Sequence, residues 1–180
     1  MLRAKRLTAQ QMAALWVEFY EVYGAEVMYE AYGWSTPTSR AVRPGERAWA
    51  FYDDTTDENP ATMNHLIGWG TCAMSLSDPD DDEAVLALGV LPQFARRGYR
   101  HQILDWLSDW AQKRGARTAK ILVYKDNEAQ YERTIREAYE FTNPWVHAGD
   151  VWFPPPGFGL FIRDLTPEAK EVACSTPESR

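Results

Sequence analysis

The chain has 180 residues, 45% of them hydrophobic and 13% aromatic, which is enough for one globular domain and excludes a disordered chain. Its two cysteines are too few for a disulfide framework or a structural zinc site, and the net charge of −7 argues against non-specific nucleic-acid binding. No apolar run approaches the roughly 18 residues of a membrane-spanning helix, and the N-terminal residues do not resemble a signal peptide, so we expect a soluble, cytoplasmic protein.

The N-terminal residues predict a short strand and then helix. Arg3–Leu7 has strand length, and Thr8 is placed to cap the helix that follows, because its side-chain oxygen can accept a hydrogen bond from a backbone N–H. Helical spacing indicates a helix over residues 9–27, and a second, shorter helix is expected to reach Tyr32. The apolar residues with this spacing are Met12, Leu15, Trp16, Phe19, Val22 and Tyr23.

Two strands are predicted next. Residues 48–52 and 65–76 are apolar segments on either side of an acidic turn at residues 53–60, an order typical of an antiparallel hairpin. We expect Cys72 to be a core thiol in the second strand, because free cysteine is among the most buried residue types. The acidic segment at residues 78–83 is interpreted as a solvated turn.

Residues 83–114 organise the chain. The apolar segment Ala84–Leu91 predicts a buried strand, and Pro92 ends it because proline supplies no N–H to a sheet. A basic turn follows at residues 95–100, and after it comes an amphipathic helix that Gly115 is placed to stop. The apolar stripe of this helix consists of Ile103, Leu107 and Trp110.

The basic turn predicts an anion-binding site. A helix N-terminus presents N–H groups and a partial positive charge, and Arg96, Arg97 and Arg100 add to this charge. Residues 96–136 hold ten Lys or Arg against five acids, whereas residues 51–95 hold nine acids and no Lys or Arg. We therefore expect a phosphate or pyrophosphate at the turn, the alternative being a solvated helix start.

The remaining residues complete a single domain over residues 1–165, and residues 166–180 are expected to form a tail. The segments predict a strand, a helix and two last strands, at residues 119–124, 127–138, 145–148 and 159–163.

From Val90 onward, the sequence VLPQFARRGYRHQIL resembles the GNAT superfamily of acyl-CoA-dependent N-acyltransferases. In that family a strand ending in Val-x-Pro is followed by a Gln/Arg-x-x-Gly-x-Gly/Ala turn and a helix, which together hold the acyl-CoA pyrophosphate. Gly98 takes the place of the first glycine, whereas Ala95 replaces Gln or Arg and Arg100 replaces Gly or Ala. The resemblance implies an α/β fold with a mixed, mostly antiparallel twisted sheet flanked by helices.

The resemblance also implies which residues bind the donor. The backbone of the strand Leu86–Val90 would pair with the pantetheine arm, and an amide near Gly89 or Val90 would polarise the acyl carbonyl. Asn127 matches the asparagine that precedes the family's last helix. The implied acyl-CoA-binding residues are Leu88, Gly89, Val90, Ala95, Arg96, Arg97, Gly98, Tyr99, Arg100 and Asn127, and no metal is expected.

Two residues are catalytic candidates. The family often has a tyrosine seven residues after the asparagine, as a general acid toward the departing thiolate, but Thr134 stands there in this chain. Tyr131, one helical turn after Asn127, is the best available proton donor, and Thr134 could instead hold a water molecule. Glu83 is the nearest candidate base; a water chain or an amine that arrives neutral is equally consistent. The unplaced histidines are His65, His101 and His147.

The resemblance thus implies an N-acetyltransferase that moves an acetyl group from acetyl-CoA to a primary amine of a small molecule or protein, by direct attack in a ternary complex. A longer acyl donor stays open, and the acidic segments favour a cationic acceptor such as a polyamine, an aminoglycoside or a lysine side chain. For Trp145 and Trp152 we expect one of three roles: they pack in the core, they line an acceptor cleft, or they contact a second copy in a homodimer. The alternatives are a non-catalytic module of the same fold and, disfavoured by charge, a nucleic-acid binder.

Overall fold

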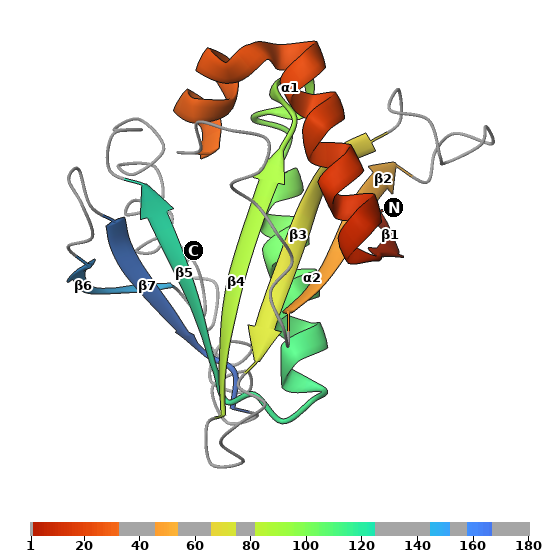
Figure 1. Ribbon diagram of the computed structural model, residues 1–180. Helices are drawn as coiled ribbons and strands as arrows, with labels where there is room; N and C mark the ends of the chain where they lie inside the picture. Colours follow the sequence, from red (N-terminus) through yellow and green to blue (C-terminus); the bar gives the residue numbers. More distant parts are fainter. Residues whose placement is uncertain are drawn as a thin grey trace, which may run out of the picture. The chain divides into compact units, whose positions relative to one another are not determined.

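The structure is a computed structural model that describes residues 2–32, 46–53, 66–74, 82–124, 145–151 and 158–166. Its elements in chain order are β1 (Leu2–Leu7), α1 (Ala9–Tyr32), β2 (Glu46–Asp53), β3 (Leu66–Met74), β4 (Glu83–Val90), a 3₁₀ turn (Pro92–Phe94), α2 (Tyr99–Gln112), β5 (Thr118–Tyr124), β6 (Val146–Val151) and β7 (Phe158–Asp164) (Figure 1). The helix predicted at residues 127–138 lies outside the described residues. Among the described helices, none is long and apolar enough to cross a membrane.

The chain folds into two compact units. Unit 1 consists of Met1–Ala73 and Leu86–Leu107, and unit 2 consists of Met74–Val85 and Ser108–Arg180, so β4 and α2 contribute residues to both. The strands follow the order β1-β2-β3-β4 in unit 1 and β4-β5-β7-β6 in unit 2. This combination of strands and helices confirms the predicted α/β class, whereas the single domain over residues 1–165 stays a prediction.

Thr8 caps α1 through a reciprocal pair of hydrogen bonds with Gln11. The N–H of Thr8 donates to Oε1 of Gln11 at 2.9 Å, and the N–H of Gln11 donates to Oγ1 of Thr8 at 3.1 Å, which is the arrangement of a capping box. The helix is interrupted at Gly24, whose φ of 76° lies outside the helical range. The predicted cap and the presence of a second helix are confirmed, but the break falls at Gly24 and not after residue 27, because glycine is the residue that adopts a positive φ most easily.

In unit 1, α1 and α2 cover opposite faces of the strands (Figure 1). Because side chains alternate along a strand, every second residue of β2 faces α1 and the others face α2. On the α2 side, the rings of Trp49 and Phe51 contact Trp106 with centroids 5.2 and 5.4 Å apart. β2 pairs antiparallel with β1 and β3, as the hairpin prediction requires, and Cys72 of β3 is buried as expected. The buried cluster on the α1 side consists of Met12, Trp16, Phe19, Ala48, Ala50, Tyr52, Leu66, Trp69 and Leu91.

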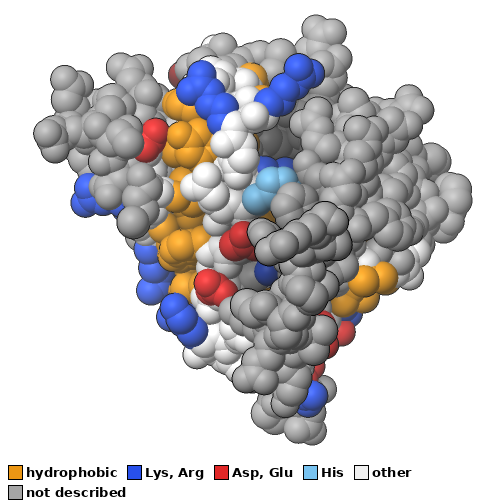
Figure 2. Space-filling model, turned by 180° about the vertical axis from the view of Figure 1, so that it is seen from behind, with side chains coloured by type: hydrophobic (Ala, Val, Ile, Leu, Met, Phe, Trp, Pro, Cys, Tyr) orange, Lys and Arg blue, Asp and Glu red, His pale blue; other side chains and the backbone are white. Residues whose placement is uncertain are grey.

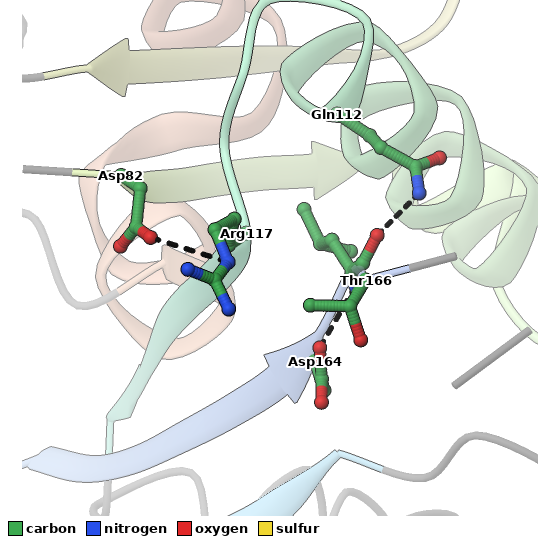
Figure 3. A network of polar contacts seen from close by, with 6 residues as sticks. Asp82, Gln112, Arg117, Asp164 and Thr166 are labelled. Carbon is green, nitrogen blue, oxygen red and sulfur yellow. Dashed lines mark hydrogen bonds and ion pairs between the residues drawn. The ribbon is translucent and has the colours of Figure 1, made fainter. Parts of the chain in front are cut away.

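In unit 2, a polar network joins the end of α2 to β5 and β7 (Figure 3). The side-chain amide of Gln112 donates to the carbonyl of Leu165, and the N–H of Leu165 donates to the carbonyl of Arg117 at 2.8 Å. The N–H of Thr166 donates to the carboxylate of Asp164 at 2.8 Å, and this bond holds the pKa of Asp164 below its usual value. β7 lies between β5 and β6 and pairs antiparallel with both.

Gly115 ends α2 as the sequence predicts. Its φ is +96°, and the N–H of Ala116 turns back to the carbonyl of Ala111 at 3.2 Å, which is the long bond of a Schellman motif. The chain then enters β5 beside Asp82: the N–H of Arg117 donates to the Asp82 carbonyl at 2.7 Å, and the two side chains form an ion pair at 3.5 Å (Figure 3).

Candidate functional site

The C-terminal end of β4 carries Leu88–Val90, the strand residues expected to meet the donor. This end is tightly joined to β3 within unit 1. The N–H of Leu91 donates to the carbonyl of Ile67 at 2.8 Å, and the carbonyl oxygen of Gly89 occupies the position that a Cβ atom on Gly68 would take. The backbone of β4 is therefore held at a fixed place directly before the basic turn.

The basic turn has a backbone shape that suits an anion. After the 3₁₀ turn, Arg96 and Gly98 adopt left-handed conformations with φ values of 64° and 78°, while Arg97 between them does not. Left-handed residues in a short turn are typical of concave backbone segments whose N–H groups bind anions. No carbonyl in the described part of the chain accepts a hydrogen bond from the N–H of Arg96, Arg97 or Gly98. Among the described residues, these three N–H groups are therefore candidate donors to a ligand.

α2 begins immediately after the turn and adds its N-terminus to the same place. The N–H of Gln102 donates to the carbonyl of Gly98 at 3.3 Å, so Gly98 precedes the first helical residue, Tyr99. The first turn of a helix presents N–H groups that no carbonyl of that helix can accept, together with a partial positive charge. Arg96 and Arg97 are exposed, and Lys and Arg side chains stand at the upper end of the face shown in Figure 2.

Side-chain contacts close the turn on itself and attach it to β2. The ring of Phe94, before the turn, meets the ring of Tyr99, after it, edge to face at 6.0 Å, and the guanidinium of Arg97 lies 5.6 Å from the Phe94 ring centre. The hydroxyl of Tyr99 donates to a carboxylate oxygen of Asp53 at 3.0 Å. Burial and this carboxylate raise the pKa of Tyr99, and the charge of Arg97 opposes the rise.

Nine of the ten residues expected to bind the donor lie in one continuous segment of the described chain, residues 88–100. Leu88, Gly89 and Val90 end β4, residues 95–98 form the turn, and Tyr99 and Arg100 begin α2. Asn127 lies outside the described residues, as do Tyr131 and Thr134.

Glu83, the candidate base, is the first residue of β4, at the opposite end of this strand from Val90. Its carboxylate forms an ion pair with Nζ of Lys120 on β5, 2.5 Å away, and both side chains are partly exposed. Within the described ranges, no three His, Cys, Asp or Glu side chains are placed to share a metal ion.

Sequence reasoning missed Asp53. The acidic segment 53–60 predicts a turn, whereas Asp53 is the last residue of β2 and a partner of Tyr99. The two residues are 46 positions apart, so no spacing rule connects them. Only the sheet order, which puts the end of β2 near the start of α2 in unit 1, brings them together.

The model of the acetyltransferase (GNAT) family matches residues 9–133. This match covers more than half of the chain, so the chain belongs to the acetyltransferase (GNAT) family. The family, predicted from the turn and its flanking elements, is confirmed, and it makes acyl transfer the general class of reaction. A search of proteins with curated functions found no match.

Solved structures of acetyltransferases share the fold. The GNAT domain of S. lividans PAT has a TM-score of 0.60 at 17% identity, over 91% of this chain and 90% of that one. An N-acetyltransferase from Staphylococcus aureus has a TM-score of 0.57 at 15% identity, over 92% and 99% of the two chains. The spermidine/spermine N-acetyltransferase SpeG from Vibrio cholerae has a TM-score of 0.57 at 11% identity, over 97% of both. At these identities the likeness shows the fold alone.

Proposed function

We propose that this protein transfers an acetyl group from acetyl-CoA to a primary amine of a small molecule or a protein. The observation that supports this most directly is the turn at residues 95–98. It combines two left-handed residues, three N–H groups with no backbone acceptor among the described residues, exposed arginines and a helix N-terminus, all shortly after β4. A pyrophosphate needs several donors and a positive field at one place, and this turn supplies both.

In the proposed complex the donor lies along the end of β4 with its pyrophosphate at the turn. The N–H groups of residues 96–98 bind the phosphate oxygens, and Arg96 and Arg97 compensate their charge. The arm of the donor pairs with the backbone of Leu88–Val90, and an amide near Gly89 or Val90 polarises the thioester carbonyl. Holding the thioester and the amine together supplies much of the rate enhancement, because reaction becomes effectively intramolecular.

The proposed chemistry is a direct attack in a ternary complex. The lone pair of the neutral amine attacks the thioester carbonyl carbon, the new C–N bond forms and the C–S bond breaks. The amine nitrogen loses a proton to a base; Glu83 is the candidate, and because it lies at the opposite end of β4 from Val90, a water chain would have to carry the proton to it. The departing thiolate gains a proton from an acid, for which Tyr131 is the candidate. Thr134 or a water molecule is the alternative proton source.

The acceptor is proposed to be cationic in solution. Acidic residues at positions 53–58 and 78–83 would attract such an amine, whether on a small molecule or on a lysine side chain. This proposal predicts that the KM for a diamine rises with salt, whereas the KM for an uncharged amine of similar size does not. We also propose a cytoplasmic location. For the tryptophans at 145 and 152, core packing is the favoured role, and an acceptor cleft or a homodimer contact are the alternatives.

The decisive experiment measures the melting temperature with and without saturating acetyl-CoA. A ligand at 100 times its Kd adds about 2.7 kcal/mol to the free energy of unfolding, which is readily detected. Gly98→Trp should abolish the shift, because a Cβ at Gly98 faces open space beside the turn and an indole there would occupy the pyrophosphate position.

The structure offers a matched control at the other end of α2. Gly115 also has a positive φ and open space around its Cβ position, so Gly115→Trp introduces the same backbone strain away from the turn. Gly115→Trp should keep the acetyl-CoA shift. If the wild type shows no shift with acetyl-CoA, free CoA or longer acyl-CoAs, the enzyme proposal is wrong and the chain is a non-catalytic module of the same fold.

A further inference from the structure

The hydrogen bond between Tyr99 and Asp53 connects the basic turn to the sheet of unit 1. Tyr99 follows Gly98 directly, so its side chain holds the C-terminal end of the turn. Asp53 ends β2, whose register with β1 and β3 is fixed by antiparallel pairing along its length. The bond, 3.0 Å long, therefore ties the turn to a strand of the sheet, whereas no backbone carbonyl among the described residues accepts from the N–H groups of residues 96–98.

The charge of Asp53 is the opposite of what donor recognition requires. A carboxylate next to an anion-binding turn repels a pyrophosphate, and at low ionic strength that repulsion extends over about 10 Å or more. A carboxylate at position 53 is explained if its hydrogen bond to Tyr99 increases the affinity for the donor by more than its charge decreases it. A hydroxyl-to-carboxylate bond is charge-assisted and about twice as strong as a neutral one.

The turn is a segment for which an external tie has a large effect. Two of its residues, Arg96 and Gly98, have positive φ, and Arg96 is not a glycine, so the observed shape has an intrinsic cost. A turn of this kind populates other shapes unless its surroundings favour one. The apparent Kd of a ligand rises in proportion as the competent shape becomes rarer.

We propose that Asp53 and Tyr99 are positioning residues for the acyl donor: their hydrogen bond holds the turn at residues 95–98 in its pyrophosphate-binding shape. Phe94 supports the same shape, because its ring packs against Tyr99 on one side and Arg97 on the other. This inference rests on the proposed use of the turn as the donor site. It adds that the affinity for CoA depends on a carboxylate that itself repels CoA.

The test measures the Kd of free CoA by calorimetry, at a temperature at which the wild type and all four variants are folded. Tyr99→Phe removes only the hydroxyl, Asp53→Ala removes both the acceptor and the charge, and Asp53→Asn removes the charge but keeps an acceptor. Asp105→Asn, on the exposed side of α2, removes one charge without touching the bond. Losing a hydrogen bond of ordinary strength corresponds to a change of about three- to tenfold in Kd.

We expect Tyr99→Phe and Asp53→Ala to weaken CoA binding by this factor, Asp53→Asn to weaken it less, and Asp105→Asn not to weaken it. If Asp53→Ala binds CoA more tightly and Tyr99→Phe binds it as the wild type does, Asp53 acts only through its charge and the inference is wrong. Lower melting temperatures with an unchanged Kd would make the bond merely structural and also overturn it. If the wild type does not bind CoA, the proposed function itself is wrong. This outcome is distinguishable from failure of the inference, which is judged only from differences between the variants and a wild type that binds CoA.

Discussion

The carbonyl oxygen of Gly89 lies where a Cβ atom on Gly68 would stand, closer than Cβ atoms come to other heavy atoms in proteins. Both residues belong to unit 1, Gly68 on β3 and Gly89 near the end of β4. Because the obstructing atom is part of the backbone, it cannot rotate away as a side chain can. The close approach of the two strands, just before the donor-binding turn, therefore depends on glycine at position 68.

Gly68→Ala should destabilise the protein by about 2 kcal/mol or more, because overpacking against fixed atoms forces the strands apart. The free energy of unfolding in urea measures this. Gly70→Ala on the same strand is the control: its Cβ would meet the side chains of Leu107 and Phe51 at 2.9 and 3.0 Å, and side chains can shift. An equal or smaller loss for Gly68→Ala than for Gly70→Ala would contradict the backbone origin of the effect.

Arg96→Gly should raise the free energy of unfolding, or leave it unchanged, although it removes a side chain. Arg96 has a φ of 64°, a conformation that costs an L-residue about 1 kcal/mol and glycine almost nothing. Arg97→Gly is the matched variant, because Arg97 lacks the positive φ and its guanidinium contacts Phe94. It should destabilise by about 0.5–1 kcal/mol. Chemical denaturation measures the free energy of unfolding of both variants. If Arg97→Gly is more stable than Arg96→Gly, the prediction is wrong.

The raised pKa of Tyr99 predicts how stability changes in alkali. The neutral phenol is favoured in the folded state, mainly by burial and then by its bond to Asp53, so the folded pKa lies above the unfolded value of 10.0. The resulting stability is complete below pH 10 and is lost as the pH rises through the folded pKa. Tyr52 contributes in the same direction, because burial and Glu18 raise its pKa too.

Tyr99→Phe should therefore reduce, without abolishing, the loss of stability as the pH rises above 10. Urea unfolding across this range, compared with the wild type, measures the difference. The part that remains belongs to Tyr52 and should be reduced in turn by Tyr52→Phe. If the free energy of unfolding falls with pH in the same way in the wild type and in Tyr99→Phe, the pKa of Tyr99 is not raised in the folded protein.

Much of this site could be predicted from sequence because its signals are local. The residue type of Thr8 predicts a cap, the place of Gly115 after an amphipathic segment predicts a helix end, and the match of Gly98 to the first glycine of the GNAT turn predicts its role. The left-handed conformation of Arg96 could not be predicted in this way, since arginine has no preference for it. The need for glycine at position 68 depends on where a neighbouring strand runs.

The bond from Tyr99 to Asp53 depends in the same way on the pairing of β2. These features are properties of contacts between segments distant in sequence. Rules that use residues close together in the sequence therefore cannot predict them.

The variant Glu83→Gln tests whether the Glu83 carboxylate is the catalytic base or only the ion-pair partner of Lys120. If Glu83 accepts the proton of the amine, kcat/KM should fall by about 10²–10⁴ while the Kd of CoA stays the same. If the carboxylate only pairs with Lys120, the loss is confined to stability, at about 0–1 kcal/mol for a partly exposed pair.

Lys120→Gln tells the two roles apart, because it breaks the same ion pair but leaves the carboxylate. A catalytic Glu83 predicts that Lys120→Gln keeps most of the activity that Glu83→Gln loses. Equal losses of stability and equal, small losses of activity in the two variants would exclude Glu83 as the base. The proton would then pass to a water chain, or the amine would have to arrive already neutral.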